Sequence, residues 1–163
     1  MSEKVCSFTG HRQIKSNHIA ALPSLIARAI EFAYSEGCRI FMAGGAIGFD
    51  TVAAREVIRF RMTHPDVRLH LALPCIAQDI KWNHYQRSAY EYTLREANEV
   101  IYVFEEYVQG CMAKRNQYLA DSADILIAYV SGLNSGAGQT VRMANKRGIR
   151  VYNLFPELEK IKT

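Results

Sequence analysis

The sequence predicts an α/β protein built on a doubly wound, mainly parallel six-stranded sheet with helices on both faces. Short apolar runs typical of strands alternate with segments of helical periodicity along the whole chain. Strands separated by helices are expected to be parallel and joined by right-handed crossovers. The 163 residues suffice for one domain, expected over residues 1–163. We expect the strand order 3-2-1-4-5-6 that is common in such sheets.

In the first half of the chain, each strand is followed by a helix. Pro23 is tolerated in the first turn of a helix, and Gly37 is placed to end that helix. Pro74 ends a run that first alternates and then becomes apolar. The expected strands are residues 5–8, 39–43 and 67–73, and the expected helices begin near Leu22, Phe49 and His84.

The second half of the chain continues the alternation. β-branched and aromatic residues fill the run over residues 99–104. The run over residues 124–130 is the clearest buried strand of the chain. The remaining expected elements are a strand at residues 150–154, helices at 112–122 and 139–147, and a polar tail after residue 154.

The glycine turn after the second strand is the strongest functional signal. Gly44, Gly45 and Gly48 follow the strand directly, and Asp50 stands where a helix N-cap is expected. Glycine lets a ligand approach bare backbone, and a helix N-terminus attracts anions. One interpretation is a tight turn with a capping aspartate. Three glycines in five positions exceed what a turn needs, so a phosphate- or carboxylate-binding loop is favoured.

The loop after the first strand is a second candidate, since ligands on such sheets bind beyond the carboxyl ends of the strands. It contains Thr9, Gly10, His11 and Arg12. An arginine there can bind phosphate through its guanidinium group, or it can pair with a surface carboxylate. His11 is equally consistent with a loop histidine bonded to nearby backbone.

Two later segments complete the expected site. The loop over residues 135–140 again combines small residues, hydroxyl groups and a helix start. Arg115 and Asn116 stand near the start of another helix, either facing the ligand or on a solvated face. The candidate residues of the later loop are Gly136, Gly138, Gln139 and Thr140.

Charge, hydropathy, cysteine spacing and missing motifs argue against several classes of protein. The net charge is +4, and lysine and arginine never form a basic run, so binding of nucleic acid is disfavoured. No apolar run approaches the ~20 residues of a membrane helix and no signal peptide is evident, so a cytoplasmic location is expected. The four cysteines are far apart, which predicts buried, reduced thiols and no metal site. Neither the dinucleotide fingerprint nor a Walker loop is present, and no cofactor is required.

Several segments together resemble a known family: SFTGHR, GGAIGFDTVAA, Trp82 after the third strand, RNQYLADSADILIAY and the late SGAGQT loop. They resemble the YpsA-like branch of the SLOG superfamily, Rossmann-like proteins related to the Lonely Guy phosphoribohydrolases and to the DNA-processing protein DprA. The resemblance implies a nucleotide or nucleotide-derived ligand held by the residues singled out above, and it mildly favours a homodimer.

The sequence departs from the Lonely Guy hydrolases at one point. Their PGGxGTxxE motif supplies a glutamate that acts on an N-glycosidic bond, whereas this chain has no glutamate between Tyr107 and Pro156. The leading hypothesis is therefore a binding or sensing protein. The alternatives are an N-glycosidic hydrolase that uses Asp50 or Glu105, and a DprA-like binder of single-stranded DNA. As an N-cap, Asp50 would stay ionised and turned toward backbone amides.

Overall fold

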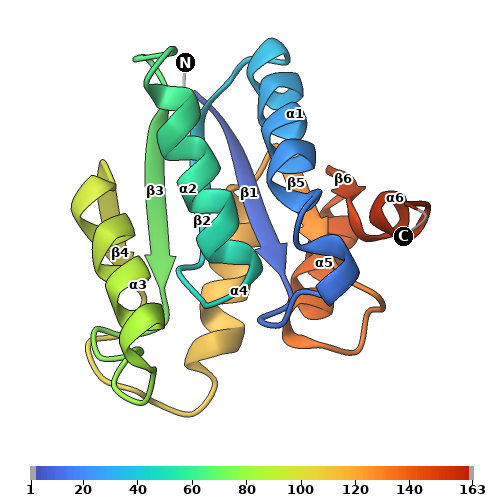
Figure 1. The fold of residues 1–163 in the computed structure, drawn as a ribbon. Coiled ribbons are helices and arrows are strands. Elements are labelled where there is room, and N and C mark those ends of the chain that lie inside the picture. Colours follow the sequence, from blue (N-terminus) through green and yellow to red (C-terminus); the bar gives the residue numbers. More distant parts are fainter. Residues whose placement is uncertain (1–2, 162–163) are drawn as a thin grey trace.

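The computed structural model describes residues 3–161, and its centre is a six-stranded sheet with the order β4-β3-β2-β1-β5-β6 (Figure 1). Every neighbouring pair of strands is parallel, which confirms the predicted α/β class. The strands are β1 (Lys4–Gly10), β2 (Cys38–Ala43), β3 (Arg68–Leu73), β4 (Glu99–Tyr102), β5 (Ile125–Tyr129) and β6 (Arg150–Asn153).

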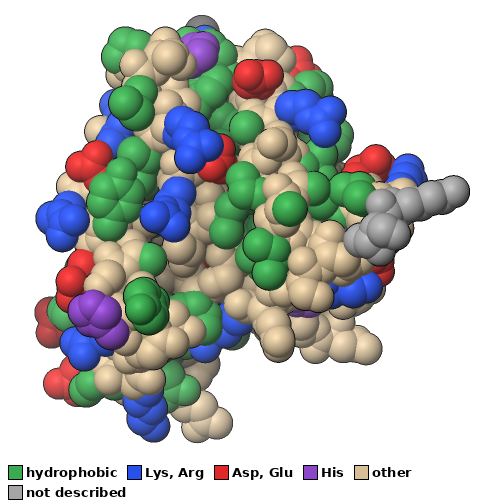
Figure 2. Space-filling view, in the orientation of Figure 1, with side chains coloured by type: hydrophobic (Ala, Val, Ile, Leu, Met, Phe, Trp, Pro, Cys, Tyr) green, Lys and Arg blue, Asp and Glu red, His purple; other side chains and the backbone are tan. Residues whose placement is uncertain are grey.

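Helices cover both faces of the sheet. On one face α2 packs between α1 and α3, and charged side chains of both signs are scattered over this layer (Figure 2). On the other face α4 packs against α5. None of the described helices is long and apolar enough to span a membrane. The helices are α1 (Leu22–Ser35), α2 (Phe49–Arg61), α3 (His84–Glu96), α4 (Cys111–Ser122), α5 (Gly136–Arg147) and α6 (Phe155–Glu159), with a short 3₁₀ turn at Ser16–His18.

The alternation of side chains along β1 divides the core into two parts. Cys6 and Phe8 are fully buried in the larger part, with apolar residues of α1 and α2. Ser7 points to the opposite face, where its hydroxyl donates to the carbonyl oxygen of Leu119 in α4 at 2.8 Å. Burying a Phe or Leu side chain contributes about 1.5–3 kcal/mol to the free energy of unfolding. Because β1 makes contacts on both of its faces, both helix layers hold it in place.

The expected strand order is wrong at one position: β4 lies at the edge beside β3, and β5 lies beside β1. Burial explains the difference. All five residues of β5 are buried, which suits a place near the centre of the sheet. In β4, Glu99 and Tyr102 are exposed, as at an edge. The strand order therefore reverses between β1 and β5.

The helix boundaries were predicted well except at the two C-terminal helices. Gly148, with φ of 77°, ends α5 as the C-cap, but α5 begins at Gly136, so much of the expected late loop forms its first turn. The expected polar tail contains α6. Glu159 of this helix contacts the Nε2 atom of the buried His18 at 3.0 Å, which ties α6 to the segment after β1.

Candidate functional site

The candidate site is a cavity of about 270 Å³ at the carboxyl edge of the sheet. The loop after β1 and the N-terminal segments of α2, α4 and α5 meet around it. Since each helix N-terminus carries partial positive charge, three of them around one cavity favour an anion. The wall consists of Thr9, Gly10, His11, Arg12, Ala46, Asp50, Met112, Arg115, Asn116, Leu119, Ser135, Gly136 and Ala137.

Asp50 is not the N-cap of α2. That position belongs to Gly48, and Asp50 is the second helical residue. One carboxylate oxygen of Asp50, Oδ2, accepts a hydrogen bond from the backbone N–H of Ala46 at 3.2 Å. The other, Oδ1, is buried and has no hydrogen-bond partner among residues 3–161. A buried oxygen without a partner is costly, and this one belongs to a residue of the cavity wall.

Burial changes the protonation of Asp50. It raises the pKa of this carboxyl group from 3.8 to about 6, although the charges of Arg115 and Arg12 and the hydrogen bond from Ala46 act in the opposite direction. Asp50 therefore holds its charge less firmly than an exposed aspartate does, although it is still mainly ionised at pH 7. A carboxyl group with a pKa near neutrality can exchange a proton under physiological conditions.

Arg115 faces Asp50 across Gly44. A β-carbon on Gly44 would lie 2.8 Å from Nη1 of Arg115 and 2.9 Å from Oδ2 of Asp50, so only glycine leaves room for both groups. Arg115 is 6% exposed, and its Nη1 donates to the carbonyl oxygen of Gly44 at 2.5 Å. Burial lowers the pKa of the guanidinium group, and Asp50 opposes this. Arg115 thus lies in the cavity wall and not on a solvated face.

Asn116 links α4 to α5. Its Oδ1 accepts from Nε of Arg115 at 3.0 Å, and its Nδ2 donates to the carbonyl oxygen of Gly136 at 3.2 Å. The same Nδ2 contacts Oε1 of Gln139 at 3.3 Å. The amide therefore fixes the distance between the arginine and the first turn of α5.

Arg12 is the exposed cation of the wall. It takes part in none of the ion pairs found among residues 3–161, so the alternative of a surface carboxylate partner does not hold. His11 beside it accepts a hydrogen bond at Nε2 from the backbone N–H of Ser131 at 2.9 Å. Burial lowers the pKa of His11, which favours a neutral ring that ties two loops together.

Ser135 caps α5, since its hydroxyl accepts from the backbone N–H of Gly138 at 3.0 Å. The N–H groups of Gly136 and Ala137 have no acceptor within the helix, and both residues line the cavity. Thr140 was expected to contact the ligand, but it is fully buried. Gln139, Thr140 and Gly138 are absent from the cavity wall, because the expected loop has become helix.

The glycines of the first turn serve the chain itself. Gly45 and Gly48 have φ of 69° and 81°. A β-carbon on Gly45 would lie 2.2 Å from Cδ2 of Leu73, and one on Gly48 would lie 2.1 Å from the carbonyl oxygen of Arg12. Neither residue lines the cavity, so their direct contact with a ligand is not supported.

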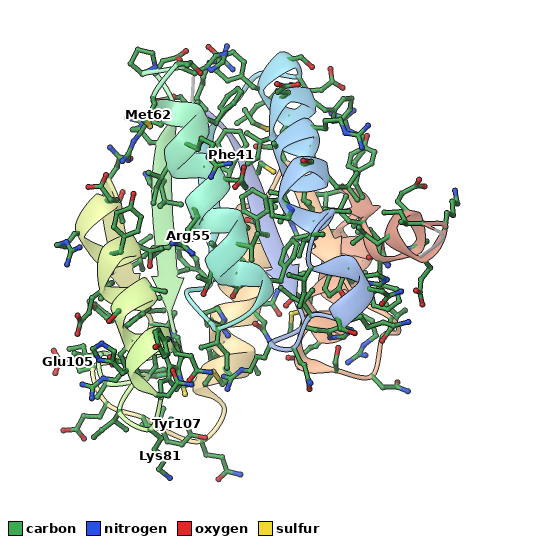
Figure 3. All side chains as sticks on the ribbon, viewed as in Figure 1. Phe41, Arg55, Met62, Lys81, Glu105 and Tyr107 are labelled. Atoms are coloured by element: carbon green, nitrogen blue, oxygen red, sulfur yellow. The ribbon has the colours of Figure 1, made fainter. Side chains whose placement is uncertain are left out.

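Two other candidates also lie outside the cavity wall. Trp82 packs edge-to-face on Tyr90, with ring centroids 5.1 Å apart. Glu105 is exposed on the loop after β4, at the margin of the molecule (Figure 3). The apolar wall residues Ala46, Met112, Leu119 and Ala137 were missed. Met112 stands three residues before Arg115 on the same helix face, which is the one signal that could have found it.

Comparison with known proteins identifies the family. The sequence model of the YspA SLOG family matches residues 8–149, so the chain belongs to this family, as the resemblance implied. Similar sequences include the "Uncharacterized SPbeta prophage-derived protein YoqJ" of Bacillus subtilis (strain 168), 27% identical over 89% of each chain. The UPF0398 protein BH1768 of Halalkalibacterium halodurans is 26% identical over 88% of this chain and 82% of its own.

Solved structures with the same fold include two of DNA processing protein A. The protein from Helicobacter pylori, described with a single-stranded DNA binding mode, has a TM-score of 0.64 and 18% identity over 92% of this chain. The protein from Streptococcus pneumoniae has a TM-score of 0.62 and 14% identity over 91% of this chain. This chain spans 64% and 49% of those chains. At these identities the likeness shows the fold alone.

Proposed function

We propose that this member of the YspA SLOG family binds a nucleotide or nucleotide-derived ligand in the cavity. One observation carries the proposal: the wall combines Asp50, one of whose carboxylate oxygens is buried without a partner among residues 3–161, with a separate group of cationic and N–H donors. A nucleotide offers the matching pair, since its ribose hydroxyls donate hydrogen bonds and its phosphate accepts them.

The phosphate belongs at the donor side of the cavity. Arg12 is exposed and forms no ion pair within residues 3–161, so its guanidinium group is free to bind two phosphate oxygens. The N–H groups of Gly136 and Ala137 at the start of α5 add donors and the positive end of the helix dipole. The buried charge of Arg115 lies in the same wall.

The ribose belongs at Asp50. A phosphate beside this carboxylate would meet like charge, whereas a hydroxyl can donate to the unpartnered Oδ1. The hydrogen bond compensates the cost of burying that oxygen. The two ends of the ligand are thus held apart: the sugar lies toward α2, at Asp50, and the phosphate lies toward the loop after β1, at Arg12.

Thermal unfolding in the presence of nucleotides tests the proposal. A ligand at 100 times its dissociation constant adds about 2.7 kcal/mol to the free energy of unfolding. We expect AMP to raise the melting temperature more than adenosine does at equal concentration, because only AMP reaches the donor side. A panel of nucleoside mono- and diphosphates that leaves the melting temperature unchanged, together with no heat of binding in calorimetry, would contradict the proposal.

A second candidate function is hydrolysis of an N-glycosidic bond, and the pKa of about 6 for Asp50 favours it. In that reaction water adds to C1′ of the ribose, the bond from C1′ to the base nitrogen breaks, and the base leaves with a proton. Ionised Asp50 would take the proton from the water. The late glycine loop offers no carboxylate, because the residues that follow it at the start of α5 are Gln139, Thr140, Val141, Arg142 and Met143.

Base release separates the two functions. We expect AMP and the other nucleoside monophosphates to bind without release of free base, measured by chromatography after long incubation. Turnover near the median enzymatic rate of about 10 per second, lost in Asp50→Asn, would instead make Asp50 the catalytic carboxylate and replace the binding function by the hydrolase.

A further inference from the structure

A second cavity, of about 610 Å³, lies next to the first. The two share Arg12 and Met112 in their walls, so they border each other at these side chains. A ligand that occupies the first cavity can therefore extend past these side chains into the second space. Nothing in the proposed function uses this cavity.

The wall of the second cavity is rich in apolar and aromatic surface. Ile80 and Tyr107 line it, and each is 71% exposed, so both side chains offer apolar surface to a ligand. Trp82 lines it too, with its ring fixed edge-to-face against the buried Tyr90. Lys81 and Tyr107 extend from neighbouring loops at the same end of the molecule (Figure 3).

We infer that this second cavity is a base subsite, in which the nucleobase of a nucleoside phosphate stacks on Trp82 and Tyr107. The inference rests on the proposed function, because it needs the phosphate to lie at Arg12. A nucleobase is flat, apolar on its faces and polar at its edges. Such a group stacks on aromatic side chains, and each of the bases can do so. Lys81 at the rim supplies a donor for the acceptor atoms of a purine edge. The ligand class is therefore a nucleoside phosphate whose ribose lies at Asp50, so that the phosphate on C5′ points to the donor side of the first cavity and the base on C1′ passes Met112 into the second.

The chain contains a single tryptophan, Trp82, so fluorescence excited selectively at tryptophan reports on the surroundings of this residue. Stacking of a purine on the indole ring should quench the emission, and ribose 5-phosphate, which lacks the base, should bind without quenching it. Titrations of the whole chain with AMP and with ribose 5-phosphate, followed by fluorescence and by calorimetry, measure both properties.

Two variants then separate the contribution of the base to binding from that of the phosphate. Tyr107→Ala removes an exposed ring and should leave the fold intact, and Tyr85→Ala is the matched control, because Tyr85 is 84% exposed and lines neither cavity. Loss of one base stack in Tyr107→Ala should lower the affinity for AMP by about 5- to 150-fold. Ribose 5-phosphate should bind Tyr107→Ala as it binds the wild type, and Tyr85→Ala should change neither ligand.

The outcomes distinguish this inference from the proposed function. If AMP binds without quenching Trp82 and Tyr107→Ala binds it normally, the base lies elsewhere and the subsite is wrong, although the proposed function stands. If Tyr107→Ala changes only the sedimentation of the protein, the apolar surface contacts a second copy of the chain, which also overturns the subsite. If neither ribose 5-phosphate nor any nucleotide of the panel binds, the proposed function fails and the base subsite fails with it.

Discussion

Asp50 shows how the same residue type changes its chemistry with its surroundings. The sequence places it at a helix start, where an aspartate usually caps exposed N–H groups. In the structure Gly48 occupies the cap position, and Asp50 is buried across Gly44 from Arg115, with one oxygen that has no partner among the described residues. Its position in the chain was readable from the sequence. Its burial was not, because burial depends on α4, which begins some sixty residues later.

Asp50 should make the stability of the protein depend on pH. The folded state holds this proton up to a pKa of about 6, whereas the unfolded state releases it near 3.8. Between these values the folded state binds more protons, so the free energy of unfolding should fall as the pH rises. Well above pH 6 the loss levels off, on the order of 3 kcal/mol. Urea unfolding across this range should show a flatter profile in Asp50→Asn than in the wild type.

Asp121→Asn is the control for that experiment, since Asp121 is exposed on α4 and should keep the wild-type profile. Equal profiles in all three proteins would show that the carboxyl group of Asp50 titrates at its ordinary pKa, and the second candidate function would lose its support.

Arg12 should contribute to binding only through the phosphate. We expect Arg12→Ala to weaken AMP by about 1.5–3 kcal/mol, the usual range for hydrogen bonds to charged groups, and to weaken adenosine much less. Arg55→Ala is the matched control, because Arg55 is exposed on α2 (Figure 3) and lies outside both cavity walls. Calorimetry with both ligands measures the four affinities. Equal losses for AMP and adenosine would be inconsistent with a phosphate at Arg12.

At the scale of elements, local patterns predicted the strands and helices, whereas their arrangement needed information on burial. The apolar runs and the glycines at helix ends located every strand and most helix boundaries. The place of β4 was missed because strand order was taken from a common topology. Glu99 and Tyr102 of β4 are exposed, whereas β5 is fully buried. This difference indicates that β4 lies at the edge of the sheet and β5 near its centre.

The site residues likewise fall into two groups, those that local patterns predicted and those that depend on contacts between distant segments. Parallel strands end at one edge, so the loop after β1 and the helix starts could be placed together from the sequence. Which glycines face a ligand could not be predicted. Gly45 and Gly48 have positive φ and approach Leu73 and Arg12 of the chain itself, and sequence alone does not reveal such contacts between distant segments.

Gly48 should therefore matter more for folding than for binding. Its φ of 81° and ψ of −124° lie in the mirror image of the β region, which glycine adopts readily, and a β-carbon would overlap the backbone of Arg12. Gly110, the N-cap of α4, also has positive φ, 84°, but a β-carbon there would meet nothing within 4 Å. We expect Gly110→Ala to cost about 1–2 kcal/mol of stability, the usual price of a left-handed residue, and Gly48→Ala to cost clearly more. Urea unfolding of both variants measures the difference, and equal costs would mean that the close approach to Arg12 relaxes easily.

At the scale of the whole molecule, the distribution of charge favours a small anion over a polymer. Twenty lysine and arginine residues stand against sixteen acidic ones, and several of the cations are paired, as Arg39 is with Asp66 and Arg150 with Glu36. On the face in Figure 2 the two signs are interspersed. A protein that binds single strands without sequence preference instead presents a positively charged groove along the backbone.

We therefore expect no tight binding of single-stranded DNA, although the fold is shared with DNA processing protein A. Fluorescence anisotropy of a labelled oligothymidylate should show no complex at an ionic strength of about 0.15 M. Any complex at low salt should weaken steeply as salt is added, because each neutralised phosphate releases counterions. AMP should not displace it, since the contacts would be scattered over the surface and would not involve the cavity. A complex that persists at 0.15 M, is displaced by AMP and is lost in Arg12→Ala would contradict this expectation. It would place a DNA phosphate in the same cavity, and the dispersed charge of the surface would then be no guide to the ligand.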